Sequence, residues 1–543
     1  MAKTHKDKDR KDWSDYRAQE KGTIRKKWGS QVPVAIVFPN SYHVGMSNLA
    51  VHMLYTTFNE RDDIICERFF YEEGRPLLSF ENSRPLTDFT LVFFTLSFEL
   101  DYPNIIRILE GSSIPAFAQD RSAGCPIIIA GGICVIANPE PVSPFFDLML
   151  LGDIEATIPP FMDRFRELRD LQRENVLRAL GAFPFAYDPA LLSVDYHDSG
   201  QVKSFVPEDF SVHVEFYRGK CLGMSAITSP NTEFGSMVLV EGARGCPSRC
   251  SFCLLGNLYR FQSENIDGLP DNTRDVGIIG GGISYHPRIV EIIEALRSRG
   301  ITVHLPSLRL DEIPLSLIEL IKDDIKTLTF GIEAAAEPLR TLLGKSIGDD
   351  QIISRIAAIM AMKSFNLKLY FMIGLPGEDL EDVDAIPELV KRIRHVMIKQ
   401  GAPRGSLGNI TVHASPFIPK AATPFQWLPM ADMEDLKNKV ARLRHAFRKI
   451  DNTVFTHDSV KFSFLQAVLS RGDRRVADTV IRLARGENLP KILRESSVNL
   501  NFYALRQRPE DEVLPWDFIE GLTPKEKLLT RLQSRQPAHQ QRE

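Results

Sequence analysis

The sequence of 543 residues predicts an α/β protein with a doubly wound parallel sheet, then a partial (βα)6 barrel of the TIM type, then a helical C-terminal region. Two observations lead to this fold class. Short, nearly continuous apolar segments alternate with amphipathic segments, which is typical of buried parallel strands joined by helices. The alternation occurs twice, and the chain that follows has only helical periodicity. We divide the chain into residues 1–30, 31–190, 191–235, 236–430 and 431–543.

The composition is that of an ordinary globular protein, with 43% hydrophobic and 25% charged residues. The formal net charge of −4 argues against attraction of the whole chain to nucleic acid. No apolar run reaches the roughly 18 residues of a membrane span, and the charged start lacks the apolar stretch of a secretion signal. Seven irregularly placed cysteines are typical of a reducing compartment. We therefore expect a cytoplasmic protein with no membrane partner.

The first two segments predict a tail and a sheet. Residues 1–30 are rich in Lys, Arg and Asp, and we interpret them as a charged, flexible tail. Residues 31–190 contain the apolar runs VPVAIVFP, FTLVFFTLSF, PIIIAGG and FDLMLLGD, which are expected strands. Such sheets bind ligands at the carboxyl ends of their strands. Those ends carry the segment PNSYHVG, Gly131-Gly132 and Gly152-Asp153.

The remaining segments predict a linker, a barrel and helices. Residues 191–235 are expected to be irregular β-structure between two large domains. Residues 236–430 contain six candidate strands, SMVLVEG, DVGIIGG, ITVHLP, TLTFGIE, LKLYFMIG and NITVHA, separated by helical stretches. Residues suited to chemistry follow nearly every strand, and the active sites of (βα) barrels form at that rim. Residues 431–543 are expected to be mainly helical.

Three of the seven cysteines, Cys246, Cys250 and Cys253, lie within the segment CPSRCSFC after the first barrel strand. Their number is odd and the intervening segments are short, which disfavours disulfides. A structural zinc site usually needs four ligands, and the segment has neither a second cysteine pair nor a histidine. Three thiolates can hold three irons of a [4Fe–4S] cluster and leave the fourth iron open. The spacing therefore predicts a cluster with an exchangeable ligand.

The motif CxxxCxxC, with the aromatic Phe252 before its last cysteine, resembles the signature of the radical S-adenosylmethionine (SAM) superfamily. In that superfamily the open iron binds the amino and carboxylate groups of SAM. Reduction of the cluster then cleaves SAM to methionine and a 5′-deoxyadenosyl radical, which abstracts hydrogen from the substrate. The resemblance implies a [4Fe–4S] cluster and SAM as cofactors, and a small electron donor such as flavodoxin or ferredoxin as a partner.

The resemblance also implies residues that contact SAM, one group after each later strand. A glycine triplet stands where the family often has Gly-Gly-Glu, but Ile283 replaces the acidic residue. A hydroxyl and a guanidinium follow the third strand and suit a carboxylate or a ribose. An acidic residue follows the fourth, and FMIGLPGE matches the adenine-contacting strand and glycine turn. These candidates are Gly280, Gly281, Gly282, Ser307, Arg309, Glu333, Ile373 and Gly374.

A wider resemblance covers residues 32–527. The N-terminal sheet and the segments PFIPKAATPFQW, FLQAVLSRGDRR and EVLPWDFIEGLTPKE together resemble a largely uncharacterised subfamily of B12-binding-domain-containing radical SAM proteins. This resemblance implies a cobalamin-binding-like N-terminal domain. If cobalamin is bound, methylation at an unactivated carbon is the implied reaction; without it, rearrangement, cyclisation or thiolation is open. The substrate does not follow from the resemblance.

One string, residues 195–200, matches the cobalamin-ligand motif D-x-H-x-x-G. It lies within period-2 stretches around Asp-Ser-Gly, which predict a hairpin, and it follows the whole sheet. We therefore expect His197 to be a surface residue. The loop after the first strand contains His43 but does not match the motif. Cobalamin binding is left open by these residues.

Two alternatives were weighed against a radical SAM enzyme of unknown reaction. A tRNA methylthiotransferase usually carries a second three-cysteine cluster, and Cys66, Cys125 and Cys134 lack that spacing. A non-catalytic iron–sulfur scaffold or RNA-binding module would be supported by the basic stretch RGDRR, residues 471–475, and by the charged tail. Short basic runs are usually solvated faces, and a scaffold has no reason to keep the candidate SAM contacts. Nucleic acid is therefore not the expected partner.

Overall fold

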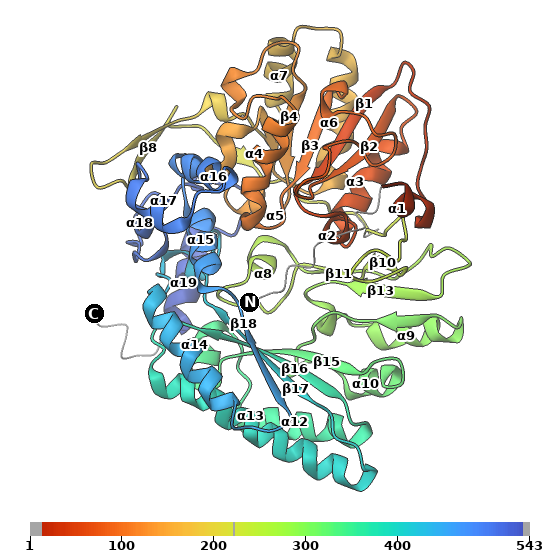
Figure 1. The fold of residues 1–543 in the computed structure, drawn as a ribbon, viewed down its shortest axis with the longest axis vertical. Helices are drawn as coiled ribbons and strands as arrows, with labels where there is room; N and C mark the ends of the chain where they lie inside the picture. Colours follow the sequence, from red (N-terminus) through yellow and green to blue (C-terminus); the bar gives the residue numbers. More distant parts are fainter. Residues whose placement is uncertain (1–12, 221–222, 536–543) are drawn as a thin grey trace.

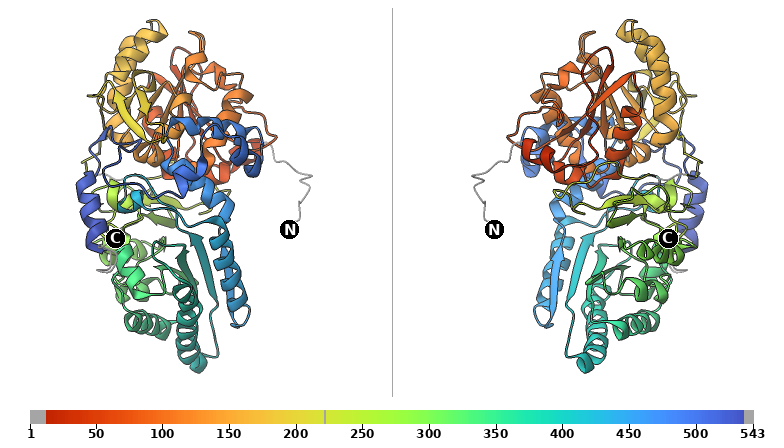
Figure 2. Two further views of the ribbon diagram at one scale, coloured as in Figure 1. Left: turned by 90° about the vertical axis from the view of Figure 1, so that its left-hand side faces the viewer. Right: turned by 90° about the vertical axis from the view of Figure 1, so that its right-hand side faces the viewer.

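The computed structural model describes residues 13–220 and 223–535, and its strands and helices form two α/β regions that lie one above the other in Figure 1. The N-terminal region is at the top and the second region at the bottom, with C-terminal helices along one side. Figure 2 shows the same stacking from two sides. The mixed α/β architecture with parallel sheets agrees with the predicted fold class.

The N-terminal region contains a six-stranded sheet with the order β2-β1-β3-β4-β5-β6. The first five strands are parallel, and β6 is antiparallel to β5. The strands are β1 Val32–Phe38, β2 Ile64–Phe70, β3 Leu91–Thr95, β4 Ile127–Gly131, β5 Leu148–Leu150 and β6 Ala186–Tyr187. The helices are α2 Tyr42–Gly45, α3 Leu49–Asn59, α4 Tyr102–Gly111, α5 Ile133–Ala137, α6 Ile154–Leu168 and α7 Arg173–Gly181. The apolar runs that predict strands form β1, β3, β4 and β5.

Strand β2 is not among the predicted strands, because Glu67 and Arg68 interrupt its apolar run. Every residue of β2 is nevertheless buried. The Arg68 guanidinium lies 2.8 Å from Glu20 and 2.6 Å from Glu81, and all three side chains are at most 3% exposed. A buried charge is tolerated when it is paired and hydrogen-bonded. The partners come from distant parts of the chain, so the strand cannot be recognised from its own residues.

Residues 13–30, which belong to the predicted flexible tail, pack against the N-terminal sheet, and this corrects the prediction. They begin with helix α1, Trp13–Gln19. The indole of Trp13 is buried and lies 5.9 Å from the ring of Tyr42 and 5.3 Å from that of Phe80, between ring centroids. Burial of aromatic side chains stabilises such docking. Residues 1–12 of the predicted tail lie outside the described residues.

The second region contains all six predicted strands in parallel pairs. Three form the sheet β10-β13-β14, and the others belong to the sheet β15-β16-β17-β18. An isolated parallel bridge between Leu308 and Phe330 joins the two sheets. The strands are β10 Val238–Glu241, β13 Asp275–Ile279, β14 Thr302–His304, β15 Thr327–Glu333, β16 Asn366–Ile373, β17 Ile410–Pro416 and β18 Thr453–His457. Their closure into one partial barrel stays a prediction.

Helices connect the strands of the second region and cover its outer side in Figure 1. They are α9 Ile289–Ser298, α10 Leu315–Ile321, α11 Glu337–Leu343, α12 Asp349–Met362 and α13 Leu380–Gly401. Helix α13 begins with a capping box in which Asp379 and Asp382 bond each other's backbone N–H groups. No helix in residues 13–220 and 223–535 has the length and apolar character to cross a membrane.

The segment between the two regions contains the predicted hairpin. Strands β7 Ser193–Tyr196 and β8 Val202–Val206 are antiparallel. His197 is exposed in their turn, where its N–H donates to the Gln201 carbonyl at 2.9 Å. The prediction that His197 is a surface residue is confirmed. The short strand β9, Val212–His213, pairs in parallel with β19, Ile519–Glu520, near the C-terminus.

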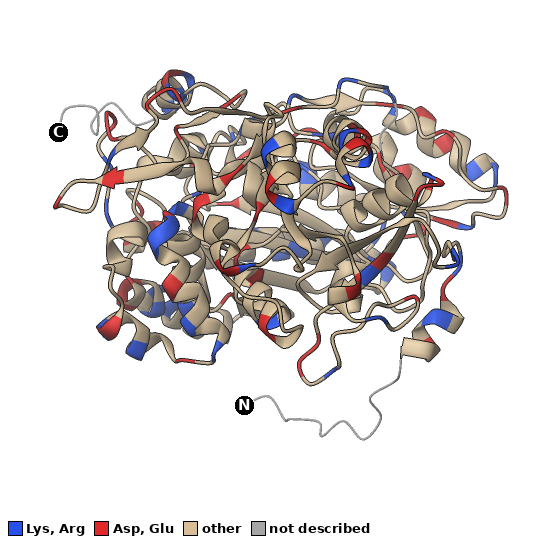
Figure 3. Cartoon of the chain, turned by 90° about the horizontal axis from the view of Figure 1, so that it is seen from above, with Lys and Arg blue, Asp and Glu red and all other residues tan. Residues whose placement is uncertain are grey.

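The C-terminal region is mainly helical, as predicted, with one correction. Its helices are α14 Met433–Phe447, α15 Val460–Arg471, α16 Ala477–Ala484, α17 Leu489–Glu495, α18 Leu500–Ala504 and α19 Lys525–Arg535. The correction is β18, which extends the second sheet because its backbone pairs with β17. Figure 3 shows acidic and basic residues interspersed over the chain, in keeping with its small net charge.

Candidate metal centre and adjoining cavity

The three cysteines lie on a loop that a short antiparallel pair of strands closes. Strands β11 Ala243–Arg244 and β12 Gln262–Ser263 pair with each other. We call residues 245–261 between them the cysteine loop; it includes the short helix α8, Leu254–Leu258. Gly245 has φ +71°, and a Cβ there would meet the Arg260 carbonyl oxygen at 2.8 Å. Glycine at this position lets the two ends of the loop approach each other.

The thiols of Cys246, Cys250 and Cys253 are free. Burial raises the pKa of Cys250, and it raises the pKa of Cys253 to about 11. Each of these pKa values is raised further by the charge of neighbouring cysteines, so the three thiols lie within electrostatic reach of one another. Within residues 13–220 and 223–535, no three His, Cys, Asp or Glu side chains are grouped closely enough to hold a metal ion. The loop thus gathers thiols without holding them in ligand geometry.

Charged side chains from two strand ends lie beside Cys250. The Arg309 guanidinium lies 3.6 Å from the Cys250 sulfur and 2.5 Å from the Asp311 carboxylate. The Lys345 ammonium lies 2.8 Å from Glu333 and donates to the Gly331 carbonyl at 2.6 Å. The charges of Lys345 and Arg309 lower the pKa of Cys250 against the effect of burial. The structure therefore brings the predicted Arg309 and Glu333 to the same cysteine.

Glu333 ends β15 in an unusual backbone conformation, with φ +69° and a register shift between Gly331 and Glu333. A side chain other than glycine rarely adopts this left-handed region. Such strain persists where the surrounding structure determines it, and it is often found at functional sites. Here the ion pair with Lys345 holds the carboxylate near Cys250.

The glycine triplet packs against the base of the cysteine loop. A Cβ at Gly280 would lie 2.5 Å from the Ala243 carbonyl oxygen, and one at Gly282 would lie 2.9 Å from that of Gly245. A Cβ at Gly281 would meet the Leu255 side chain at 2.6 Å. The triplet therefore permits close packing with the loop, which is a sufficient reason for three glycines.

The roles of Ser307, Ile373 and Gly374 as SAM contacts stay predictions. Ser307 is exposed. The Ile373 carbonyl accepts a hydrogen bond from Phe417 N–H at 2.8 Å, and Gly374 N–H donates to Glu378 at 2.6 Å. A Cβ at Gly374 would meet Leu436 of α14 at 2.6 Å. Ile373 thus contacts the end of β17, and Gly374 permits close packing against the C-terminal helix α14.

A cavity of about 320 Å³ separates the carboxyl ends of the N-terminal strands from the base of the cysteine loop. Its walls include Gly131-Gly132 and Gly152-Asp153, which were predicted as ligand-binding positions. Gly280 and Gly281 line the opposite side. Apolar side chains of α3, β3, α5 and α6 contribute to the remaining wall. Apolar cavities with a few polar groups are the usual form of small-molecule sites.

Close backbone packing, rather than ligand binding, explains why two residues at this cavity are glycines. A Cβ at Gly132, with φ +111°, would lie 2.6 Å from the Leu96 carbonyl oxygen. One at Gly152, with φ +154°, would lie 2.3 Å from that of Glu215. Their own backbone neighbours therefore require glycine. Gly131 differs, because its nearest neighbour would be 3.6 Å away.

Arg244 links the N-terminal sheet to the cysteine loop. Its guanidinium lies 3.1 Å from Asp153, 2.8 Å from Glu155 and 2.7 Å from Glu241. All four side chains line the cavity. Burial raises the pKa of Asp153, and the Arg244 charge lowers it. Three carboxylates around one cation leave this wall with an excess of negative charge.

His43 does not line the cavity. Its ring is 3.1 Å from the Glu233 carboxylate and 3.2 Å from the Asn231 carbonyl. Among the described residues that line the cavity, none is a histidine.

Sequence reasoning missed three residues of the site. Lys345 and Asp311 pair with Glu333 and Arg309, and Arg244 joins the two regions. Arg244 and Asp311 could have been predicted from their positions shortly after strand ends, where the active-site residues of such folds lie. The position of Lys345 in the sequence gave no such indication.

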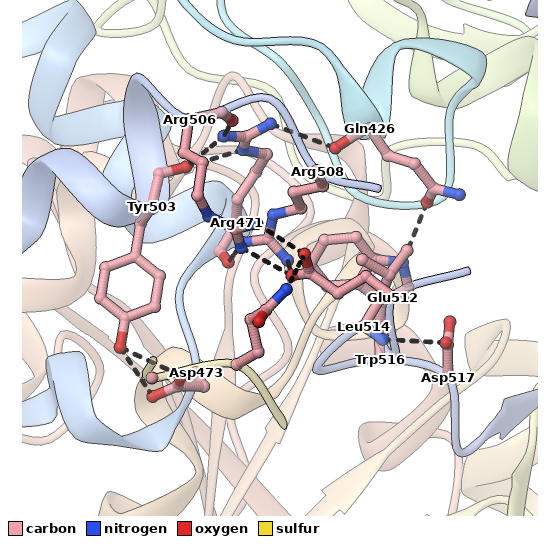
Figure 4. Close-up of polar contacts among 12 residues, drawn as sticks. Gln426, Arg471, Asp473, Tyr503, Arg506, Arg508, Glu512, Leu514, Trp516 and Asp517 are labelled. Carbon is pink, nitrogen blue, oxygen red and sulfur yellow. Dashed lines mark hydrogen bonds and ion pairs between the residues drawn. The ribbon is translucent and has the colours of Figure 1, made fainter. Parts of the chain in front are cut away.

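The arginines of the basic stretch at residues 471–475 are buried or paired with acidic side chains. Arg471 is fully buried and donates to backbone carbonyls, including those of Gln426, Leu428 and Tyr503 (Figure 4). Arg474 lies 2.8 Å from Glu140, and Arg475 lies 2.6 Å from Asp473. These arginines join the C-terminal helices to other segments, so they do not support an RNA-binding module.

Comparison with known proteins places the chain. Residues 50–189 match the family model described as "Radical SAM proteins, N-terminal". The N-terminal region is thus similar to the N-terminal part of radical SAM proteins. The matched residues belong to the N-terminal sheet, and the cysteine motif lies outside them, so the two signals are independent.

Three further proteins resemble this chain. It is 27% identical to the uncharacterised protein MJ0966 of Methanocaldococcus jannaschii, over 82% of its own chain and 89% of that protein. It is 15% identical to the cobalamin-dependent SAM radical enzyme OxsB with aqua-cobalamin bound, with TM-score 0.43, over 66% of its chain and 52% of OxsB. It is 14% identical to SAM-bound SuiB of Streptococcus suis, with TM-score 0.27, over 40% of its chain and 45% of SuiB. The chain thus spans about half the length of these two solved structures.

Proposed function

We propose that this chain is a radical SAM enzyme that holds a [4Fe–4S] cluster on Cys246, Cys250 and Cys253 and cleaves SAM reductively. The supporting observation is that three free thiols share one loop and that two charged pairs from strand ends flank Cys250. The donor set fits the cluster, since three thiolates bind three irons. When bound, the cluster supplies one electron that splits SAM into methionine and a 5′-deoxyadenosyl radical.

The residues around the loop have distinct roles in this proposal. Arg309 binds the SAM carboxylate, and Asp311 orients the guanidinium through its 2.5 Å contact. The backbone of Gly280 to Gly282 offers carbonyl oxygens to the SAM amino group beside the loop. Glu333, fixed by Lys345, accepts hydrogen bonds from SAM near Cys250. A small acidic electron carrier of the flavodoxin or ferredoxin class supplies the electron.

Iron content and magnetic resonance test this proposal. Anaerobic reconstitution should give about four irons per chain, and Cys246→Ala, Cys250→Ala or Cys253→Ala should each remove the cluster. Cys66→Ala is the matched control, because Cys66 is buried in β2. Addition of SAM should change the resonance spectrum of the reduced cluster, and Arg309→Ala should weaken this effect while iron is retained.

Two results would contradict the proposal. Full iron in any of the three cysteine variants would exclude that ligand assignment. An unchanged spectrum at saturating SAM would favour a non-catalytic iron–sulfur scaffold. The substrate is sought by incubating the reconstituted enzyme with SAM, a reductant and cell extract, followed by mass spectrometry.

The cavity supports a second proposal, that the N-terminal region binds a corrinoid as a methyl carrier for a methylation reaction. Its place at the carboxyl ends of parallel strands, facing the cysteine loop, favours this ligand. A volume of about 320 Å³ holds only part of a corrinoid, so the rest must lie outside the cavity. No histidine of the described residues lines it, so the cobalt would have no histidine ligand from this wall.

Titration with hydroxocobalamin, followed by its visible spectrum, tests the corrinoid proposal. Gly131→Leu should fill the cavity and weaken binding at least tenfold, because Gly131 lines the cavity and has room for a side chain. Gly124→Leu is the control, since Gly124 is exposed at the other end of β4. Equal binding by the two variants would exclude this cavity. If the unmodified protein does not bind, a cobalamin-free radical reaction is left.

A further inference from the structure

The last helix of the chain lies against the cysteine loop. Figure 2 shows α19, in dark blue, beside the green segment that carries the cysteines. The Arg535 guanidinium donates to the Arg249 carbonyl at 3.0 Å and to the Ser251 hydroxyl at 2.9 Å. Arg249 and Ser251 lie between the cluster cysteines in sequence. Helix α19 thus contacts the loop at the residues that flank Cys250.

A second arginine of α19 reaches the loop through Asn257. Arg531 donates to the Asn257 side-chain oxygen at 2.8 Å. The Asn257 amide in turn donates to the carbonyls of Cys250 at 2.9 Å and Cys253 at 2.8 Å. Hydrogen bonds to the backbone of ligand residues fix the directions of their side chains.

The packing around Arg535 is specific. Gly344, which ends α11 with φ +80°, would place a Cβ 2.5 Å from the Arg535 guanidinium. Ser251 also bonds the end of α11, since its N–H donates to the Leu343 carbonyl at 3.0 Å. The loop is therefore held between α11 and α19.

The arginines bring positive charge that no acid in residues 13–220 and 223–535 compensates by an ion pair. Within the described part of the chain, Arg249, Arg531 and Arg535 form no ion pair with a carboxylate. Burial lowers the pKa of Arg531, and the charges of Arg249 and Arg535 lower it further. Burial also lowers the pKa of Arg535, and the charge of Cys250 raises it. The cost of placing like charges together indicates that a negative group offsets them.

We propose that α19 is part of the metal centre: Arg531 and Arg535 clamp the cysteine loop, and Arg535 raises the reduction potential of the cluster that the loop holds. The inference rests on the proposed cluster. The cluster takes up one electron from a one-electron donor, such as dithionite or a reduced flavodoxin, and so gains one negative charge. Nearby positive charge stabilises that reduced state.

The experiment compares four variants of the full chain. Arg535→Gln and Arg531→Gln remove a charge and hydrogen bonds, and Arg535→Lys keeps the charge at the same position. Arg494→Gln is the matched control, because it removes an equal charge from an exposed side chain, 71% accessible, on another C-terminal helix. Two quantities are measured: the rate at which a maleimide alkylates Cys250 in the iron-free protein, and the midpoint potential of the reconstituted cluster.

Alkylation tests the clamp without iron. Cys250 is buried, so its modification requires the loop to open. Arg535→Gln and Arg531→Gln should raise the rate at least threefold over the unmodified protein and over Arg494→Gln. Equal rates in these proteins would overturn the clamp.

The midpoint potential tests the charge. Arg535→Gln should shift it to more negative values, Arg535→Lys should shift it less, and Arg494→Gln should leave it unchanged. An equal shift in the Gln and Lys variants, or none in either, would overturn the electrostatic role. Absence of iron from the unmodified protein would instead contradict the proposed function, and the alkylation rates would still decide the clamp.

Discussion

The carboxyl ends of the two sets of parallel strands differ in where their charged side chains lie. In the N-terminal sheet they pair with neighbouring segments: Glu99 receives hydrogen bonds from Gln466 at 2.9 Å and Ser470 at 2.9 Å, and Asp101 accepts one from Asn40 at 2.7 Å. An apolar cavity is left. In the second region the charged groups gather beside a cysteine. The same strand–helix architecture thus leaves an apolar cavity in one region and gathers charged side chains beside a cysteine in the other.

Glycines lie at the carboxyl edges of both sets of strands, but they pack against different segments. At the first edge, Gly132 and Gly152 meet carbonyl groups of their own sheet and linker. At the second edge, the triplet meets the cysteine loop. A glycine at a strand end therefore indicates close approach of a backbone, and only the structure shows whose backbone it is. Arg244 then ties the two edges together.

The largest expected effect is a difference in stability between alanine substitutions at two glycines of the N-terminal sheet edge. Gly132 has no room for a Cβ, whereas Gly131 has room. Gly132→Ala should lower the free energy of unfolding by about 4 kcal/mol, because a Cβ would combine a disfavoured φ with a clash against a carbonyl. Gly131→Ala should lower it by less than about 1 kcal/mol, since that residue has room. Urea unfolding measures both. Similar losses of unfolding free energy in the two variants would show that the two glycines do not differ in this way.

The second largest effect concerns Arg244, which links the carboxyl edges of the two sets of strands. Arg244→Gln should lower the free energy of unfolding by about 3 kcal/mol, because three carboxylates that are 8% to 21% exposed lose their cation. Arg442→Gln is the control: its partner Asp384 is 46% exposed, and such pairs contribute below about 1 kcal/mol. A loss no greater than the control's would show that Arg244 does not hold the regions together.

A smaller effect is expected in the pH dependence of the unfolding free energy, and it concerns Asp101 at the carboxyl edge of the N-terminal sheet. Burial raises the pKa of Asp101 from 3.8 to about 6, so the folded protein binds this proton more tightly than the unfolded chain. The resulting stability is fully present below the unfolded pKa and is lost as the pH rises through about 6. Relative to Asp101→Asn, the unfolding free energy should fall by on the order of 2 kcal/mol between pH 4 and pH 7. Parallel pH curves for the two proteins would contradict the assignment.

The smallest expected effect lies outside both edges. His197→Ala should change the free energy of unfolding by less than about 0.5 kcal/mol, because His197 is exposed in a hairpin turn. It should also leave any cobalamin spectrum unchanged. Loss of cobalamin binding in this variant would indicate that the ligand binds near the hairpin and not in the cavity.

Local patterns in the sequence determined much of this protein. Apolar runs predicted β1, β3, β4 and β5, because these parallel strands are buried on both faces. The six strands of the second region were also predicted, although β15, β16 and β17 alternate between buried and half-buried residues. Period-2 flanks around a turn identified the hairpin at His197. The spacing of three cysteines on one loop predicts a metal cluster, and this stays a prediction.

The tertiary structure alone decided the features that depend on distant partners. Strand β2 carries the buried charge of Arg68, which Glu20 and Glu81 neutralise. In the basic stretch, Arg471 is fully buried and Arg474 pairs with Glu140. Arg535 meets Arg249 across 286 positions of the chain. Such contacts leave no periodic signal, because each residue's burial or pairing is set by whichever segment folds against it. For the same reason, the sequence placed α19 in a helical region, whereas the structure places it at the cysteine loop.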